Sequence, residues 1–182
     1  GAALLMSNIL ASFRIQYQNP TFSLLDAIRQ VNKQLWRYSA SEDFATLFAA
    51  IVNGNTGIVR FVNAGHNAPV LVRKSGDVVR LEPTGTLIGA FDMDTWTEAR
   101  EQLEDGDFIF VFTDGVNEAM NVRDEQYTDL RMERMIVSLR DLAPAAIAER
   151  LKKPPSTEAR DYALANRQRT VKELLGQRID QL

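Results

Sequence analysis

The sequence predicts an α+β domain, because the spacing of its apolar residues changes period along the chain. A helical period runs through the first 38 residues, short apolar runs between turn residues occupy 44–113, and a helical period returns at 129–140. Helices grouped before and after a block of strands are typical of this class. With 182 residues, the chain is long enough for one domain with a sizeable core.

Two amphipathic helices are predicted at the start of the chain. The apolar stripe of the first consists of Leu5, Ile9, Phe13 and Tyr17. Asn19-Pro20 ends this helix, because a residue before proline is pushed out of the helical region. Thr21 or Ser23 then caps the second helix, whose stripe consists of Leu24, Ile28, Val31 and Leu35. We therefore expect a helical hairpin.

A block of strands follows the hairpin. The run 44–52 is apolar on both faces, which is typical of a central strand covered on both sides. Turn residues at 53–57 end it. Further strands are predicted at 58–62, 69–73, 78–81, 97–103 and 107–113. Because short turns separate the strands up to residue 81, we expect an antiparallel meander there.

The last part of the chain is predicted to be helical. A helix is expected at 129–140 and a shorter one at 145–151, and a linker rich in lysine and proline follows at 152–156. We divide the chain into a domain at 1–153 and a segment at 154–182 with an amphipathic helix. Its apolar stripe favours docking on the core over pairing in a homodimer, and consists of Leu164, Val171, Leu175, Ile179 and Leu182.

Composition excludes several classes of function. The net charge of −3 gives no support for a basic nucleic-acid-binding face. No apolar run approaches the roughly 20 residues that span a bilayer, and no signal peptide is visible. We expect a cytoplasmic protein that binds neither nucleic acid nor membrane. The chain has no cysteine and a single histidine, so hydrolytic chemistry must rely on carboxylates, hydroxyls or an oxygen-ligated metal.

Asp114 is the sharpest candidate for a metal ligand. It follows the strand predicted at 107–113 and precedes Gly115, which would allow a ligand to approach the backbone closely. A carboxylate at this place suits a hard cation such as Mg²⁺ or Mn²⁺. On spacing alone, however, an ordinary Asp-Gly turn after a strand is favoured.

Other polar residues have two interpretations each. His66 could donate a hydrogen bond or transfer a proton near a phosphate; on local pattern alone, a rim residue in a hairpin whose Asn and Gly take positive φ is favoured. Glu118 is either an acid behind the metal ligands or a residue at a helix N-terminus, and Asp43 is more readily a turn residue than a ligand. Core positions are predicted at Phe44, Phe48, Phe61, Met132 and Met135.

Several segments, taken in order, resemble the SpoIIE-type phosphatases, the bacterial branch of the metal-dependent protein phosphatase 2C (PP2C) superfamily. The Asn-Ala-Gly-His and Thr-Asp-Gly-Val-x-Glu strings are distinctive in combination, and their order outweighs the local alternatives. The resemblance covers roughly residues 1–140 and is carried by 1–7, 43–47, 62–69, 87–89, 106–107 and 113–119.

The resemblance implies a PP2C-like α-β-β-α sandwich of two antiparallel sheets flanked by helices, which we assign to the domain at 1–153. It also implies two Mn²⁺ or Mg²⁺ ions whose bridging water attacks phosphoserine or phosphothreonine. Asp114 matches a metal ligand of the family, with Gly115 beside it, and His66 and Glu118 become catalytic candidates. The first 38 residues match a pair of helices that acts as a regulatory switch.

The implied setting is bacterial partner switching that controls sigma factors. The expected substrate is a phosphorylated anti-sigma-factor antagonist, and an upstream sensor or receiver domain is an expected partner. Two departures matter. The family's Asp-x-Ser-Gly-x-Gly motif would lie before Gly1, and Asp161 is not followed by the family's last strand. We therefore expect a fragment that lacks terminal strands, with an inactive phosphatase-like scaffold as the alternative.

Overall fold

The computed structural model describes residues 2–19, 21–38, 44–118, 120, 125–143, 145–147 and 150. The chain forms two compact units, of which the first contains Gly1–His66 and Glu82–Gln102 and the second Asn67–Leu81 and Leu103–Leu182. Each unit has its own three-stranded antiparallel sheet and its own helices, which confirms the α+β class. The segment predicted as linker and final helix, 152–182, lies outside the described residues.

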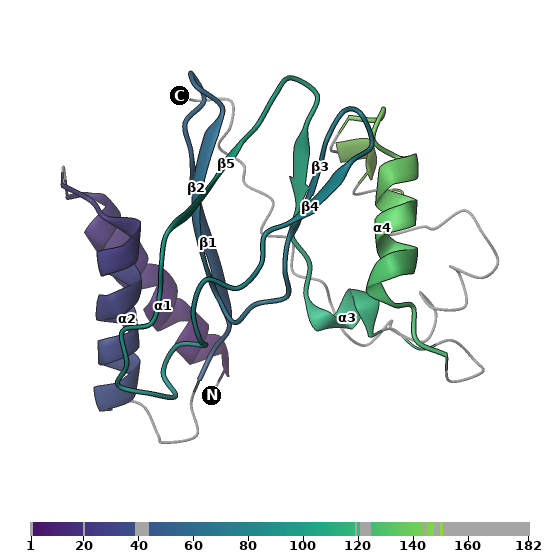
Figure 1. Ribbon diagram of the computed structural model, residues 1–182. Helices are drawn as coiled ribbons and strands as arrows, with labels where there is room; N and C mark the ends of the chain where they lie inside the picture. Colours follow the sequence, from purple (N-terminus) through teal and green to yellow (C-terminus); the bar gives the residue numbers. More distant parts are fainter. Residues whose placement is uncertain are drawn as a thin grey trace. The chain divides into compact units, whose positions relative to one another are not determined.

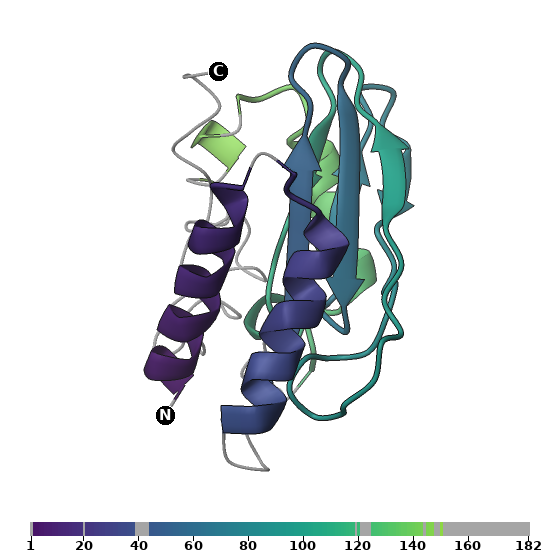
Figure 2. The same cartoon turned by 90° about the vertical axis from the view of Figure 1, so that its left-hand side faces the viewer.

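The helical hairpin predicted for the first unit is confirmed. Helix α1 spans Ala2–Tyr17 and α2 spans Leu24–Tyr38. The N–H of Asp26 donates to Ser23 Oγ at 3.2 Å, so Ser23 rather than Thr21 caps α2. The predicted stripe of α2 is buried and packs into a core with Ile9 of α1. Both helices lie on one face of the first unit's sheet (Figures 1 and 2).

The sheet of the first unit has the order β1-β2-β5, formed by Leu47–Val52, Ile58–Ala64 and Ala99–Gln102. The prediction that the strand within 44–52 is central is wrong, because β1 lies at the edge of this sheet among the described residues and none of its residues is buried. Strand β2 is central instead, and Val59 and Val62 are both fully buried. An apolar run indicates burial, but the pairing order decides which strand is covered on both faces.

The segment 82–98, which precedes β5, closes the core of the first unit. Ile88, fully buried, exchanges two backbone hydrogen bonds of 2.9 Å with Ala45. The amide of Asn32 on α2 accepts from the N–H of Gly89 at 2.7 Å and donates to the carbonyl of Phe91 at 3.0 Å. Asn32 is only 3% exposed. Its hydrogen bonds therefore hold this segment on α2 and satisfy the buried amide, so that burying it costs little free energy.

The second unit carries the sheet β4-β3-β6 with two helices. The strands are β3 Val70–Val72, β4 Val78–Arg80 and β6 Phe108–Phe110, and the helices are α3 Asp114–Asn117 and α4 Asp129–Ser138. Helix α4 packs on the central strand β3. The core between them is formed by Val70, Val72, Phe112, Met132 and Ile136.

Three further predictions need correction. The meander is right for the consecutive pairs β1–β2 and β3–β4 but wrong for β2–β3, because β2 and β3 belong to different sheets. The strand predicted at 107–113 is shorter, since only 108–110 pair with β3. Phe44 is 57% exposed and is not a core residue, whereas Phe61 and Met132 are buried as predicted. No helix in the described ranges has the length and apolar character needed to cross a membrane.

A buried ion pair fixes the turn that leads into β6. The Asp107 side chain is 2% exposed and lies 2.9 Å from Arg73 Nη1. Backbone N–H groups of Lys74 and Glu104 also donate to its carboxylate, at 2.9 and 3.1 Å. Burial raises the pKa of Asp107, but the hydrogen bonds from Arg73, Lys74 and Glu104 and the Arg73 charge outweigh it, so the pKa lies below its ordinary value.

This lowered pKa predicts a loss of stability in acid. Because the folded protein holds the proton less tightly than the unfolded chain, the stabilisation is complete above a pH of about 4 and is lost as the pH falls through the folded-state pKa. Asp107→Asn should lower the free energy of unfolding at pH 7 by about 3 kcal/mol and flatten its dependence on pH between 2 and 5. Urea denaturation measures both. The exposed neighbour variant Asp105→Asn serves as the control, and an unchanged pH dependence in Asp107→Asn would contradict the assignment.

Candidate functional site

The segment that follows β6 carries Asp114 from the core to the surface. Phe112 is 5% exposed and stacks on Phe110, with ring centroids 5.7 Å apart. Two residues later, Asp114 begins the short helix α3 and its side chain is exposed. Thr113 precedes this helix in an extended conformation, and its carbonyl accepts from the N–H of Val116 at 3.0 Å. The carboxylate is thus presented from a rigid base.

Crowding among the described residues does not explain the glycine at position 115. A Cβ atom built on it would meet Thr113 Oγ1 at 3.8 Å, which is an ordinary contact. Gly115 also has no positive φ angle. The fold of the described residues therefore tolerates a larger side chain here, and the prediction that Gly115 leaves room for a ligand remains a prediction.

Glu118 lies at the end of α3, not at the beginning of a helix. It is the C-terminal capping residue, and its N–H donates to the carbonyl of Asp114 at 2.9 Å. The interpretation as a helix N-terminal residue is therefore wrong. The side chain is exposed. Glu118 and Asp114 thus belong to the same helical turn, joined by a backbone hydrogen bond.

His66 lies in the first unit, at the end of β2, in a closely built turn. Its N–H donates to Asn63 Oδ1 at 2.8 Å, and a hydrogen bond of 3.1 Å joins its Nδ1 to Thr46 Oγ1. Asn63 is fully buried and pairs with Thr84 through its backbone. The hairpin interpretation is wrong here, because the buried Asn63 side chain caps the turn and only the glycine has positive φ.

Gly65 is required by this turn. Its φ is +68°, and a Cβ atom built on it would lie 3.0 Å from the backbone nitrogen of Leu87. The Asn-Ala-Gly-His and Leu-Ile-Gly segments, twenty residues apart in the sequence, therefore touch within the first unit. The contact places the half-buried His66 on a rigid backbone.

Asp114 fits the requirements of one ligand for Mg²⁺ or Mn²⁺. It offers a hard carboxylate oxygen on an exposed side chain, at the start of a helix that follows the buried Phe112. The described residues contain no group of three or more His, Cys, Asp or Glu that could hold an ion. Asp114 is therefore a candidate for one ligand and not part of a complete set among these residues, while Asp43 and Asp161 lie outside them.

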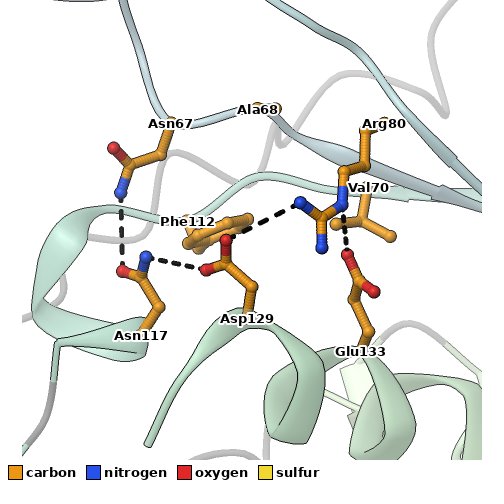
Figure 3. A pocket seen from close by; sticks show the side chains of 8 residues that line it. All are labelled: Asn67, Ala68, Val70, Arg80, Phe112, Asn117, Asp129 and Glu133. Carbon is orange, nitrogen blue, oxygen red and sulfur yellow. Dashed lines mark hydrogen bonds and ion pairs between the residues drawn. The ribbon is translucent and has the colours of Figure 1, made fainter. Parts of the chain in front are cut away.

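A small half-open pocket next to α3 was not foreseen from the sequence (Figure 3). Its volume is about 110 Å³. Polar side chains from separate elements meet across it, and the apolar residues Val70 and Phe112 also line it. The polar residues are Asn67, Arg80, Asn117, Asp129 and Glu133. They lie up to 66 residues apart in sequence, and no local pattern signals their contact.

Solved structures identify the class of fold. The RsbU and RsbW domains of Rv1364c from Mycobacterium tuberculosis match 76% of this chain at 22% identity and a TM-score of 0.64. The PP2C phosphatase domain of SpoIIE from Bacillus subtilis matches 87% at 20% identity and a TM-score of 0.62. The phosphatase PstP, solved with two manganese ions, matches 90% at 14% identity and a TM-score of 0.60. The expected PP2C-like fold is confirmed.

The family follows from the sequence match. The model of the family described as Stage II sporulation protein E (SpoIIE) matches residues 1–161, and the chain belongs to this family. Protein IcfG of Synechocystis sp. is 29% identical over 113 residues, or 59% of this chain. The chain spans 17% of IcfG, 39% of the Rv1364c structure, 46% of the SpoIIE structure and 75% of the PstP structure.

The substitution Gly115→Ala tests whether this glycine serves the fold or a ligand. Because a methyl group fits and alanine favours a helix, we expect the free energy of unfolding to rise by about 0.5–1 kcal/mol. Thermal unfolding measures this change. Gly65→Ala is the matched control and should lose about 1–3 kcal/mol, because its φ is positive. A loss of stability in Gly115→Ala would show that the fold itself requires the glycine.

Proposed function

We propose that the chain is part of a metal-dependent phosphoprotein phosphatase that hydrolyses phosphoserine or phosphothreonine. The observation that carries the proposal is the exposed Asp114 carboxylate in a Thr-Asp-Gly string on a PP2C-like fold, in a member of the SpoIIE family. In this proposal Asp114 is one ligand of a centre of two Mn²⁺ or Mg²⁺ ions, and the other ligands come from outside the described residues. Such ions supply an activated water and neutralise charge on the phosphate.

The residues of the chain have distinct parts in this proposal. Asp114 binds a divalent ion through a carboxylate oxygen. Glu118, one helical turn further, adds negative charge near that ion. His66 donates a hydrogen bond or a proton at the phosphate, oriented by the hydrogen bond between its Nδ1 and Thr46.

The proposed substrate is a phosphorylated anti-sigma-factor antagonist, with an upstream sensor or receiver domain as a partner. This part rests on the family resemblance, since membership of the SpoIIE family by itself does not select a substrate. The proposal places the protein in partner switching. A panel of phosphorylated antagonist proteins, compared with an unrelated phosphoprotein, tests this choice of substrate through the ratio of their kcat/KM values.

The substitution Asp114→Asn tests the catalytic proposal directly. Asparagine keeps the size of the side chain but loses the charge that binds a hard cation, so turnover of a phosphoprotein with Mn²⁺ should fall by at least about 10²-fold at unchanged thermal stability. The full-length product of the gene is the protein to assay. Asp105→Asn removes the same charge from another exposed site of the second unit and should leave turnover unchanged.

Two outcomes would count against this account. Wild-type turnover in Asp114→Asn would show that the ligand assignment is wrong. No turnover by the unsubstituted full-length protein, with Mn²⁺ or Mg²⁺ and each antagonist of the panel, would favour the alternative of a phosphatase-like scaffold.

A further inference from the structure

Asn117 joins α3 to two neighbouring segments of the second unit. It is the last residue of α3, three positions after Asp114, and is half-buried. Its Nδ2 donates to Asp129 Oδ1 at 2.8 Å, and its Oδ1 accepts from Asn67 Nδ2 at 3.5 Å. Its backbone carbonyl accepts from the N–H of Thr128 at 2.9 Å. A side chain that donates on one side and accepts on the other is required here, which an amide provides.

The carboxylate of Asp129 contacts both Asn117 of α3 and Arg80 of strand β4. Its Oδ1 accepts from Asn117, while its Oδ2 lies 3.8 Å from Arg80 Nη1 on β4. Arg80 Nε in turn donates to Glu133 Oε1 at 2.7 Å, and the Glu133 side chain is only 15% exposed. Figure 3 shows the chain of contacts from Asn67 through Asn117 and Asp129 to Arg80 and Glu133. It links α3, α4 and β4.

The residue before α4, Thr128, has a backbone conformation that a non-glycine residue rarely adopts. Thr128 has φ +66° and ψ 153°, and it is the one non-glycine residue with positive φ among the described residues. Such a conformation costs about 1–3 kcal/mol and persists only where surrounding contacts determine it. The hydrogen bonds from Thr128 N–H to Asn117 and from Met132 N–H to Thr128 hold it in place. The junction between α3 and α4 is therefore fixed by tertiary contacts.

We propose that Asn117, Asp129 and Arg80 form a brace that positions Asp114. Helix α3 is a single turn, so its orientation comes from the buried Phe112 before it and from Asn117 at its end. Without the brace, α3 has no fixed orientation, and the Asp114 carboxylate moves with it. This inference rests on the proposed function of Asp114 as a metal ligand. The three brace residues touch neither substrate nor ion, and act through Asp114.

The test measures Mn²⁺ binding by titration calorimetry and by electron paramagnetic resonance, using the full-length product of the gene. Asn117→Ala and Asp129→Ala should each weaken Mn²⁺ binding by about 10–100-fold, the usual effect of removing a group that orients a ligand. The value of kcat should fall, while KM for the phosphoprotein stays unchanged. Because both variants break one connection, the double variant should bind no more weakly than the weaker single variant.

A conservative variant separates positioning from a general loss of stability. Asp129→Asn keeps the oxygen that accepts from Asn117 but loses the charge that faces Arg80, so it should restore part of the Mn²⁺ affinity lost in Asp129→Ala. Arg134→Ala, an exposed cation of α4 outside the brace, is the control and should bind Mn²⁺ as the unsubstituted protein does. If Asp129→Ala does not fold, Asn117→Ala and Arg80→Gln provide the same comparison.

The outcomes distinguish this inference from the proposal on which it rests. If Asp114→Asn binds Mn²⁺ normally, the proposed function itself is wrong. If Asp114→Asn loses Mn²⁺ binding while folded Asn117→Ala and Arg80→Gln keep full affinity, the brace alone is refuted. Additive losses in the double variant would also overturn it, because they would show that Asn117 and Asp129 act separately.

Discussion

The position of the Asp114 carboxylate depends on how a single helical turn is held at its two ends. Before it, Phe112 is buried against the core of the second unit, which is worth about 2–3 kcal/mol for a side chain of this kind. At its end, the hydrogen bond between Asn117 and Asp129 contributes about 0.5–1.5 kcal/mol, because the Asp129 side chain is 43% exposed. Together, the burial of Phe112 and the hydrogen bond of Asn117 favour one orientation of this turn. The site proposed for this protein follows from that orientation.

The first unit holds His66 by the same kind of constraint. A buried Asn63 side chain fixes its N–H, and the glycine before it leaves room for the backbone of Leu87. Hydrogen bonds between Asn32 and the residues just after Leu87 fasten that segment to α2. In both units, the candidate site residue, Asp114 or His66, lies on a short segment whose own sequence does not determine its conformation. Hydrogen bonds to polar side chains determine it instead: to the buried Asn63 and Asn32 in the first unit, and to the half-exposed Asp129 in the second.

Local periodicity predicted α1, α2 and α4, because an apolar stripe at a helical period has one favourable arrangement on a core. The single turn α3 carries no such stripe and was not predicted. The strands were located, but their pairing was not predicted, since an apolar run such as 44–52 does not indicate which strand it pairs with. Asp114 was found because aspartate and glycine at a strand end form a recognisable string. The contacts of Asn117, Asp129 and Arg80 were missed because each is an ordinary polar residue, and only the fold brings them together.

Diffraction from crystals of the full-length protein grown with Mn²⁺ tests the central claim most directly, because anomalous scattering locates the ions. The account predicts an Mn²⁺ ion within coordination distance of an Asp114 carboxylate oxygen, with the amide of Asn117 still bonded to Asp129. Ions bound elsewhere, with the Asp114 carboxylate directed into solvent, would contradict it.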